Sequence, residues 1–76
     1  MNRRELLVKQ KLESDGWRVL RNGAPDFVAL KVQDGEIVAV KWVEVKSKIG
    51  RLTYEQGVYQ QIFQKAGITF EVNIVD

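Results

Sequence analysis

The fold is decided by residues 25–46, which read PDFVALKVQDGEIVAVKWVEVK. Two segments of this stretch, 27–32 and 37–46, are rich in β-branched and aromatic residues, the composition that strands favour. They are joined through Asp34-Gly35, a pair typical of hairpin turns. The stretch therefore predicts a β-hairpin whose open end carries polar residues on both strands.

The register of this hairpin decides whether Asp26 and Glu44, which lie on different strands, can share a site. If the two acids face each other directly, Gln33 pairs with Ile37 and residues 34–36 form a three-residue loop. A two-residue turn would instead direct Asp26 to the opposite face of the sheet from Glu44. A shared site therefore requires the three-residue loop or a β-bulge.

The segments on either side of the hairpin predict two helices and two further strands. Residues 3–15, rich in Leu, Glu, Lys and Gln, form a helix that ends at Gly16, and residues 17–20 form a short strand. Thr53 begins a second helix, and residues 68–74 alternate as a final strand. The order α-β-β-β-α-β predicts an α/β domain, of the mixed α+β kind, in which two helices pack on one sheet.

Both predicted helices carry an apolar stripe that would meet the sheet. In the first helix, Val8 and Leu12 lie on one stripe with Met1, and the acid Glu5 falls in the middle of it. In the second helix the inward residues are Tyr59, Ile62, Phe63 and Ala66. An acid on an inward stripe marks the first helix as a contributor to a polar site.

The composition excludes several kinds of chemistry. The chain has 76 residues, the size of one small domain, and we assign residues 1–76 to it. It contains no cysteine or histidine, which excludes thiolate or imidazole metal sites and catalysis by Ser-His-Asp or Cys-His groups. No apolar run is as long as a membrane span, and the N-terminal residues lack the apolar segment of a secretory signal. We therefore expect a cytoplasmic protein with no membrane partner, whose chemistry rests on carboxylates, lysine, hydroxyls and an added ion.

Three acids and a lysine form a candidate site at the open end of the hairpin. Glu44 and Lys46 are two residues apart on one strand, so their side chains share a face of the sheet. Asp26 begins the neighbouring strand, and Glu5 comes from the first helix. Carboxylates at the end of a sheet form a hard oxygen site suited to Mg²⁺, and the lysine lies near a metal-bound water and a phosphate. This set predicts metal-assisted hydrolysis of phosphodiesters.

Each of these residues also has a structural interpretation. Glu44 and Lys46 could lie on a solvated strand face, and Asp26 could be a turn residue. Glu5 could complement the dipole of its helix, and Gln56 could serve only the capping box of the second helix. For the whole chain, the alternatives are a DNA-binding module that keeps the fold without activity, and a small α/β subunit whose acids are structural.

A longer pattern connects these residues: Glu5, GW at 16–17, RNGAPDFV at 21–28, WVEVKS at 42–47 and GRLTYEQ at 50–56. It resembles the virus-type replication-repair nuclease (VRR-NUC) family of the PD-(D/E)xK nuclease superfamily, in the stand-alone form of phages and bacteria. The resemblance implies an αβββαβ restriction-endonuclease-like core and a Mg²⁺-dependent DNA endonuclease, with Mn²⁺ as a substitute ion. It also implies resolution of Holliday junctions by a homodimer in a bacterial host or a phage-infected cell. Nicking, flap cleavage and plain duplex cleavage stay open.

The resemblance assigns catalytic roles to individual residues. Asp26 and Glu44 match the metal-binding acids, joined by the backbone carbonyl of Val45. Lys46 matches the lysine that orients or deprotonates the attacking water. Two helix residues complete the catalytic set. Glu5 is a candidate second or outer metal ligand, and Gln56 supports the site.

Basic residues that flank these motifs are candidates for contacts with DNA. When the three site acids and Lys46 are left out, 11 basic and 7 acidic residues remain of the 12 and 10 in the chain, a net charge of +4. Such a surface suits a phosphate backbone and predicts salt-sensitive binding. We assign the DNA contacts to five residues: Arg3, Arg4, Arg21, Lys48 and Arg51.

Overall fold

The computed structural model describes all residues of the chain except 22, 24 and 76. Its elements are α1 (Arg3–Ser14), β1 (Arg18–Arg21), β2 (Phe27–Gln33), β3 (Glu36–Lys46), α2 (Tyr54–Lys65) and β4 (Thr69–Ile74). The strands form one sheet in the order β1-β2-β3-β4, in which β2 is antiparallel to both neighbours and β4 is parallel to β3. The predicted element order and fold class are confirmed. Among the described residues, no helix is long and apolar enough to cross a membrane.

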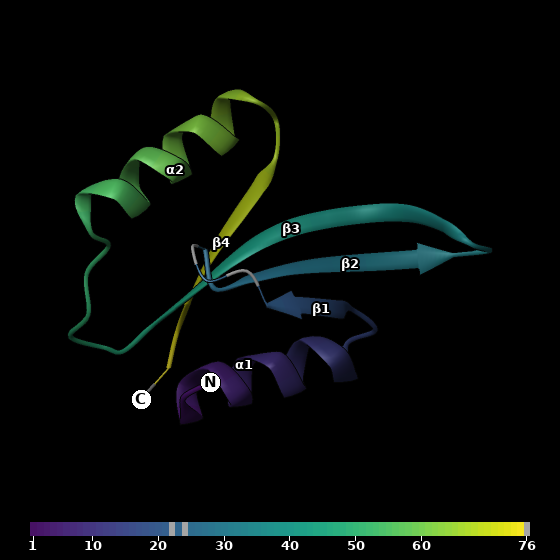
Figure 1. The fold of residues 1–76 in the computed structure, drawn as a ribbon, viewed down its shortest axis with the longest axis horizontal. Coiled ribbons are helices and arrows are strands. Elements are labelled where there is room, and N and C mark those ends of the chain that lie inside the picture. Colours follow the sequence, from purple (N-terminus) through teal and green to yellow (C-terminus); the bar gives the residue numbers. More distant parts are fainter. Residues whose placement is uncertain (22, 24, 76) are drawn as a thin grey trace.

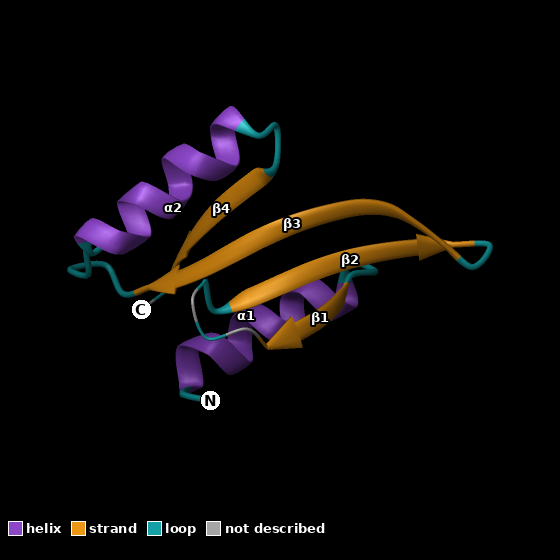
Figure 2. Ribbon diagram, turned by 45° about the horizontal axis from the view of Figure 1, so that its top comes forward, coloured by secondary structure: helices purple, strands orange, loops and turns teal. Residues whose placement is uncertain are grey.

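The sheet separates the two helices, with α1 on one face and α2 along β4 on the other (Figures 1 and 2). Val43 of β3 belongs to the cluster that packs against α1. The preceding residue, Trp42, stacks on Phe63 of α2 with ring centroids 5.0 Å apart. Successive side chains of β3 therefore point to opposite faces of the sheet. Glu44 and Lys46 lie on the same face as Trp42, which is the face that α2 covers.

Both helices begin with a complete capping box. At α1, the Asn2 side chain accepts a hydrogen bond from the backbone N–H of Glu5, whose carboxylate accepts one from the Asn2 N–H. At α2, Thr53 and Gln56 exchange the same pair of hydrogen bonds, as predicted. Because these bonds tie the third residue of each helix to the backbone, the Glu5 and Gln56 side chains are held at the helix starts.

The turn of the β2–β3 hairpin is the shorter of the two that the sequence left open. Gln33 pairs with Glu36 and not with Ile37, so the loop has two residues instead of three. Asp34 and Gly35 form this loop with φ values of 52° and 79°, the left-handed conformations that two-residue hairpin turns require. Aspartate tolerates this conformation and glycine adopts it freely, so the local sequence favours the shorter turn.

A β-bulge restores the register that the short turn would have lost. The register shifts by one residue next to Lys31, and at the open end of the hairpin Phe27 pairs with Val43. One position further along, Asp26 and Glu44 therefore face each other on the same side of the sheet. Of the two solutions that the sequence allowed, the molecule has adopted the bulge.

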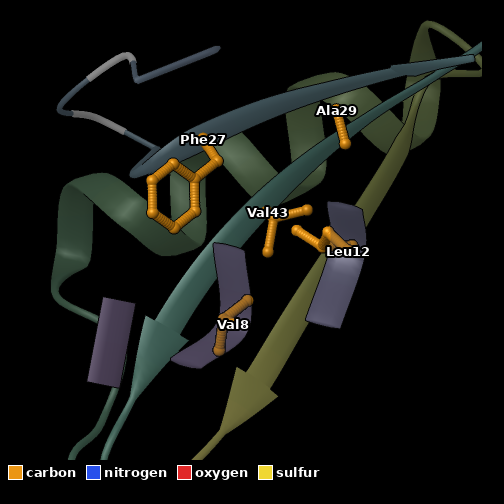
Figure 3. Packing of buried hydrophobic residues seen from close by; sticks show 5 residues of the cluster. All are labelled: Val8, Leu12, Phe27, Ala29 and Val43. Atoms are coloured by element: carbon orange, nitrogen blue, oxygen red, sulfur yellow. The ribbon is translucent and has the colours of Figure 1, made fainter. Parts of the chain in front are cut away.

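The hydrophobic core lies between α1 and the sheet (Figure 3). It consists of Val8, Leu12, Phe27, Ala29 and Val43. Val8 and Leu12 lie on the inward stripe predicted for α1, whereas Met1 is 47% exposed at its start. Phe27 and Val43 have no exposed surface and directly adjoin Asp26 and Glu44 in the sequence. The best-packed part of the domain therefore fixes the strand ends that carry the two acids.

The second helix, α2, packs through a different set of residues from the one predicted, since its half-buried positions are Gln56, Gly57, Val58, Gln60 and Phe63. Phe63 stacks on Trp42 and on Phe70 of β4, with ring centroids 5.0 and 5.8 Å apart. The other residues predicted to point inward are exposed instead: Tyr59, Ile62 and Ala66. α2 lies over β4 at the edge of the sheet (Figure 2), so only one line of its surface meets the strands.

Candidate active site

Asp26 and Glu44 meet at the open end of the hairpin, where each carboxylate is held by the backbone of the opposite strand. The N–H of Val45 donates to Asp26 Oδ2 at 2.8 Å. The N–H of Asp26 donates to Glu44 Oε2 at 3.3 Å. This reciprocal arrangement depends on direct cross-strand pairing, and a shift of one residue would send one carboxylate to the other face.

Glu44 is nearly enclosed, with 3% of its surface exposed. Its Oε1 atom accepts a hydrogen bond from Gln56 Nε2 at 2.6 Å and lies 3.5 Å from Lys46 Nζ. Gln56 uses its own Oε1 atom to accept the Thr53 N–H at 2.9 Å. The helix cap thus orients the amide so that its nitrogen faces Glu44. A glutamate would complete the same capping box, but it could not donate to Glu44.

The carboxyl groups of Asp26 and Glu44 hold their protons more tightly than they would in water. Burial is the main cause that raises the pKa of Asp26, and the charge of Glu5 raises it further. Burial also raises the pKa of Glu44, and the charge of Asp26 adds to the effect. The N–H of Val45 and the charge of Lys46 act in the opposite direction on Asp26. The remaining repulsion between carboxylates is what a bound cation would relieve.

Glu5 combines a structural contact with a position beside the pair. Its Oε2 atom accepts the Asn2 N–H at 2.9 Å as part of the α1 capping box. Its charge also contributes to the raised pKa of Asp26. Helix capping and membership of the acidic cluster are therefore compatible roles for this side chain.

The donor set fits a hard divalent cation. Enzymes bind Mg²⁺ through one or two carboxylates together with substrate phosphates, and the ion keeps several waters. Asp26 and Glu44 supply two carboxylates on neighbouring strands. In the described part of the chain, no group of three or more acidic, histidine or cysteine side chains could hold a metal ion.

The basic residues assigned to DNA are all exposed: Arg3, Arg4, Arg21, Lys48 and Arg51. Arg21 pairs with Phe27 across β1 and β2, which puts it at the same open end as Asp26. Arg4 also donates from Nε to the carbonyl oxygen of Val75 at 3.2 Å. This hydrogen bond ties α1 to the segment after β4, so Arg4 has a structural role as well.

Asn2 is a residue of the site that the sequence patterns had not singled out. It receives the Glu5 N–H at 2.9 Å and donates its own N–H to the Glu5 carboxylate. Asparagine three residues before a glutamate, at the start of a helical segment, is a capping-box signature. That signal was present in the sequence and predicts the orientation of Glu5.

The α-β-β-β-α-β order, with Pro25-Asp26 facing Glu44-x-Lys46 at one end of a mixed sheet, defines a core of the PD-(D/E)xK class. Comparison with protein families shows that the chain belongs to the VRR-NUC family, whose domain profile matches residues 3–76. Searches among curated proteins and solved structures returned no match. Membership of this family indicates a nuclease that binds DNA.

Proposed function

We propose that the chain is a metal-dependent endonuclease that hydrolyses phosphodiester bonds of branched DNA, with Holliday junctions as the leading substrate. The observation that carries this proposal is the cross-strand pair of Asp26 and Glu44, with Lys46 Nζ 3.5 Å from the Glu44 carboxylate. A surface that only binds DNA would gain nothing from carboxylates that repel phosphates. A buried acidic pair beside a lysine is instead an arrangement that suits metal-assisted hydrolysis of a phosphodiester.

Asp26 and Glu44 would hold Mg²⁺, or Mn²⁺ as a substitute, together with the backbone carbonyl of Val45. When bound, such an ion neutralises charge that develops on the phosphate and activates a water as the nucleophile. The chain fixes both carboxylates before DNA arrives, through the N–H of Val45 and the amide of Gln56. Fixing them in advance lowers the entropy cost of assembling the site around the phosphate.

Lys46 is placed to act on the attacking water. Its position on the same strand face as Glu44, with 20% of its side chain exposed, leaves it accessible to water and to a phosphate oxygen. In the proposed mechanism the Lys46 ammonium donates hydrogen bonds that orient the attacking water and the phosphate, as a new P–O bond forms and the bond to the leaving oxygen breaks. Glu44 keeps the lysine beside the site throughout.

The proposal includes a homodimer, because a four-way junction has two-fold symmetry and its resolution needs two cuts. Two leucines on α1 support this assembly, since Leu6 and Leu7 are 46% and 41% exposed. Apolar surface of this kind is a candidate for burial in a subunit interface. A DNA substrate would place the protein in the cytoplasm of a bacterium or a phage-infected cell.

A cleavage panel tests the proposal. The protein is incubated with a four-way junction, a flap and a plain duplex, each with Mg²⁺, Mn²⁺ or EDTA. We expect paired cuts near the branch of the four-way junction, only when a metal is present. Cleavage confined to flaps or duplex would keep the nuclease and change its substrate. Binding without cleavage in either metal would contradict the proposal and favour a DNA-binding module.

A further inference from the structure

The connection between β3 and α2, residues 47–53, starts and ends at the candidate active site. Lys46, which lies 3.5 Å from Glu44, immediately precedes it. Gln56, which donates to the same carboxylate at 2.6 Å, follows in the first turn of α2. Figures 1 and 2 show that this connection runs along the outside of the domain, at the end of the sheet opposite the hairpin turn. The connection is therefore anchored at the site on both sides.

Two large apolar side chains are exposed to solvent here, one within the connection and one at the first position of α2. Ile49 is 93% exposed and Tyr54 is 87% exposed, the two highest values among the large apolar residues that the structure describes. A single exposed apolar residue needs no explanation. Two of them within six positions, beside a site for phosphodiesters and next to the exposed cations Lys48 and Arg51, form a surface with both apolar and phosphate-binding groups.

The local backbone holds Ile49 at the tip of a tight turn. The N–H of Gly50 donates to the carbonyl oxygen of Ser47 at 3.0 Å, which leaves Lys48 and Ile49 as the two central residues. A Cβ atom on Gly50 would lie 3.1 Å from Ser47 Oγ and 3.3 Å from the Ser47 backbone, so the turn is closely packed. Neither central residue has a positive φ, so the turn is of a kind that accepts most residue types. The central position leaves the Ile49 side chain 93% exposed.

We propose that Ile49 and Tyr54 are specificity-determining residues that contact unstacked bases at the branch point of DNA. Ile49 enters between base pairs as an apolar wedge, and Tyr54 stacks on a base that has lost its neighbour. Lys48 and Arg51 hold the flanking phosphates. This inference rests on the proposed function and deepens it, because it explains how the site selects DNA with disrupted stacking over a continuous duplex.

Nucleic acid fits this surface better than a protein partner because of the charges around it. The connection carries Lys48 and Arg51 but no acidic residue between positions 47 and 53. Ile49 lies between the two cations, whereas Tyr54 borders a hollow on α2 together with Glu55, Val58 and Tyr59. Apolar side chains beside cations match bases between phosphates. Loss of one aromatic stacking contact lowers affinity for single-stranded nucleic acid by about 5- to 150-fold. A continuous duplex offers no such contact, so its affinity should change by less than about 3-fold.

The test measures binding in EDTA, which separates it from cleavage. A four-way junction and a duplex of equal length carry 2-aminopurine, at the branch and at the matching duplex position, and affinity is read by fluorescence anisotropy. Wild-type protein should bind the junction more tightly and raise its 2-aminopurine fluorescence through unstacking. Tyr54→Ala should weaken junction binding by about 5- to 150-fold and abolish the rise, while Tyr54→Phe retains both. Ile49→Ala, which removes the apolar wedge, should also weaken junction binding and abolish the rise.

Ile62→Ala is the matched control, since Ile62 is 51% exposed on α2 and lies two turns beyond Tyr54. It should bind like wild type. The inference is overturned if Tyr54→Ala and Ile49→Ala bind the junction like Ile62→Ala, or if they weaken duplex binding equally. It is also overturned if wild type does not raise 2-aminopurine fluorescence, or if either variant changes the oligomeric state in light scattering, which would identify a protein interface. Because no metal is present, a protein that never cleaves can still pass or fail this test.

Discussion

Replacing Gln56 with glutamate separates its two contacts. The substitution keeps the capping box of α2, because a glutamate carboxylate can accept the Thr53 N–H as Gln56 Oε1 does. It removes the donor that contacts Glu44 Oε1 at 2.6 Å and puts a second negative charge beside a carboxylate that is only 3% exposed. We therefore expect Gln56→Glu to be destabilised although its helix cap is intact.

The size of the effect follows from the contact that is lost. A hydrogen bond to a charged group contributes about 1.5–3 kcal/mol. Two like charges about 4 Å apart near a protein surface repel by up to about 4 kcal/mol, which side-chain rotation and proton uptake reduce. A total of about 2–4 kcal/mol is therefore expected, and 2 kcal/mol alone lowers the melting temperature of a domain of this size by roughly 8–16 °C.

Thermal unfolding followed by circular dichroism in EDTA measures the effect. Gln61→Glu, which adds the same charge at an exposed position of α2, is the matched control and should change stability by less than about 0.5 kcal/mol. Burial already raises the pKa of Glu44, so the native state takes up a proton at higher pH than the unfolded chain does. The deficit of Gln56→Glu should therefore be full at pH 7 and shrink as the pH falls. Equal melting temperatures for Gln56→Glu and Gln61→Glu at pH 7 would refute the reasoning.

Three further predictions concern the metal, the lysine and the assembly. Mg²⁺ at ten times its dissociation constant should stabilise the wild type by about 1.4 kcal/mol, or roughly 5–10 °C in melting temperature. Asp26→Asn should be at least as stable without metal and gain little from it, and identical Mg²⁺ responses would contradict a metal site. Lys46→Ala should nearly abolish cleavage but bind junction DNA almost normally in anisotropy, whereas near-normal turnover would exclude its catalytic role. Light scattering should show a dimer at micromolar concentration that Leu6→Glu with Leu7→Glu dissociates; a wild-type monomer that still makes paired cuts would count against it.

The strands, and the polar residues at the open end of the hairpin, could be predicted from the sequence because side chains alternate between the two faces of any β-strand. This alternation predicted that Glu44 and Lys46 share one face, and the structure shows Lys46 Nζ 3.5 Å from Glu44 Oε1. The bulge was only one of two solutions, since a continuous apolar run at positions 37–40 does not mark which residue is the extra one. The Asp34-Gly35 turn settled the choice, because its preferred geometry leaves no third loop residue.

The docking of α2 could not be read in the same way. Its sequence carries an apolar stripe, but the stripe does not say how much of the helix reaches the sheet. Phe63 alone of the predicted inward residues packs between Trp42 and Phe70, because α2 lies over the edge strand. The contact between Gln56 and Glu44 depends on that docking. The capping box was therefore predictable from the sequence and a supporting role of Gln56 followed from the resemblance to a family, whereas the hydrogen bond to Glu44 is seen only in the structure.

The central claim is that the Asp26–Glu44 pair forms the metal site that cleavage requires, and single-turnover cleavage of a four-way junction across Mg²⁺ concentrations tests it most directly. Three proteins are compared: wild type, Asp26→Asn, and Glu55→Gln, which removes an exposed acid from the first turn of α2. Asparagine at position 26 can still accept the Val45 N–H, so the backbone contact is kept. The account predicts that Asp26→Asn cleaves at least about 100-fold more slowly at every Mg²⁺ concentration while Glu55→Gln matches wild type. Cleavage by Asp26→Asn within about 2-fold of wild type, with the same Mg²⁺ dependence, would contradict it.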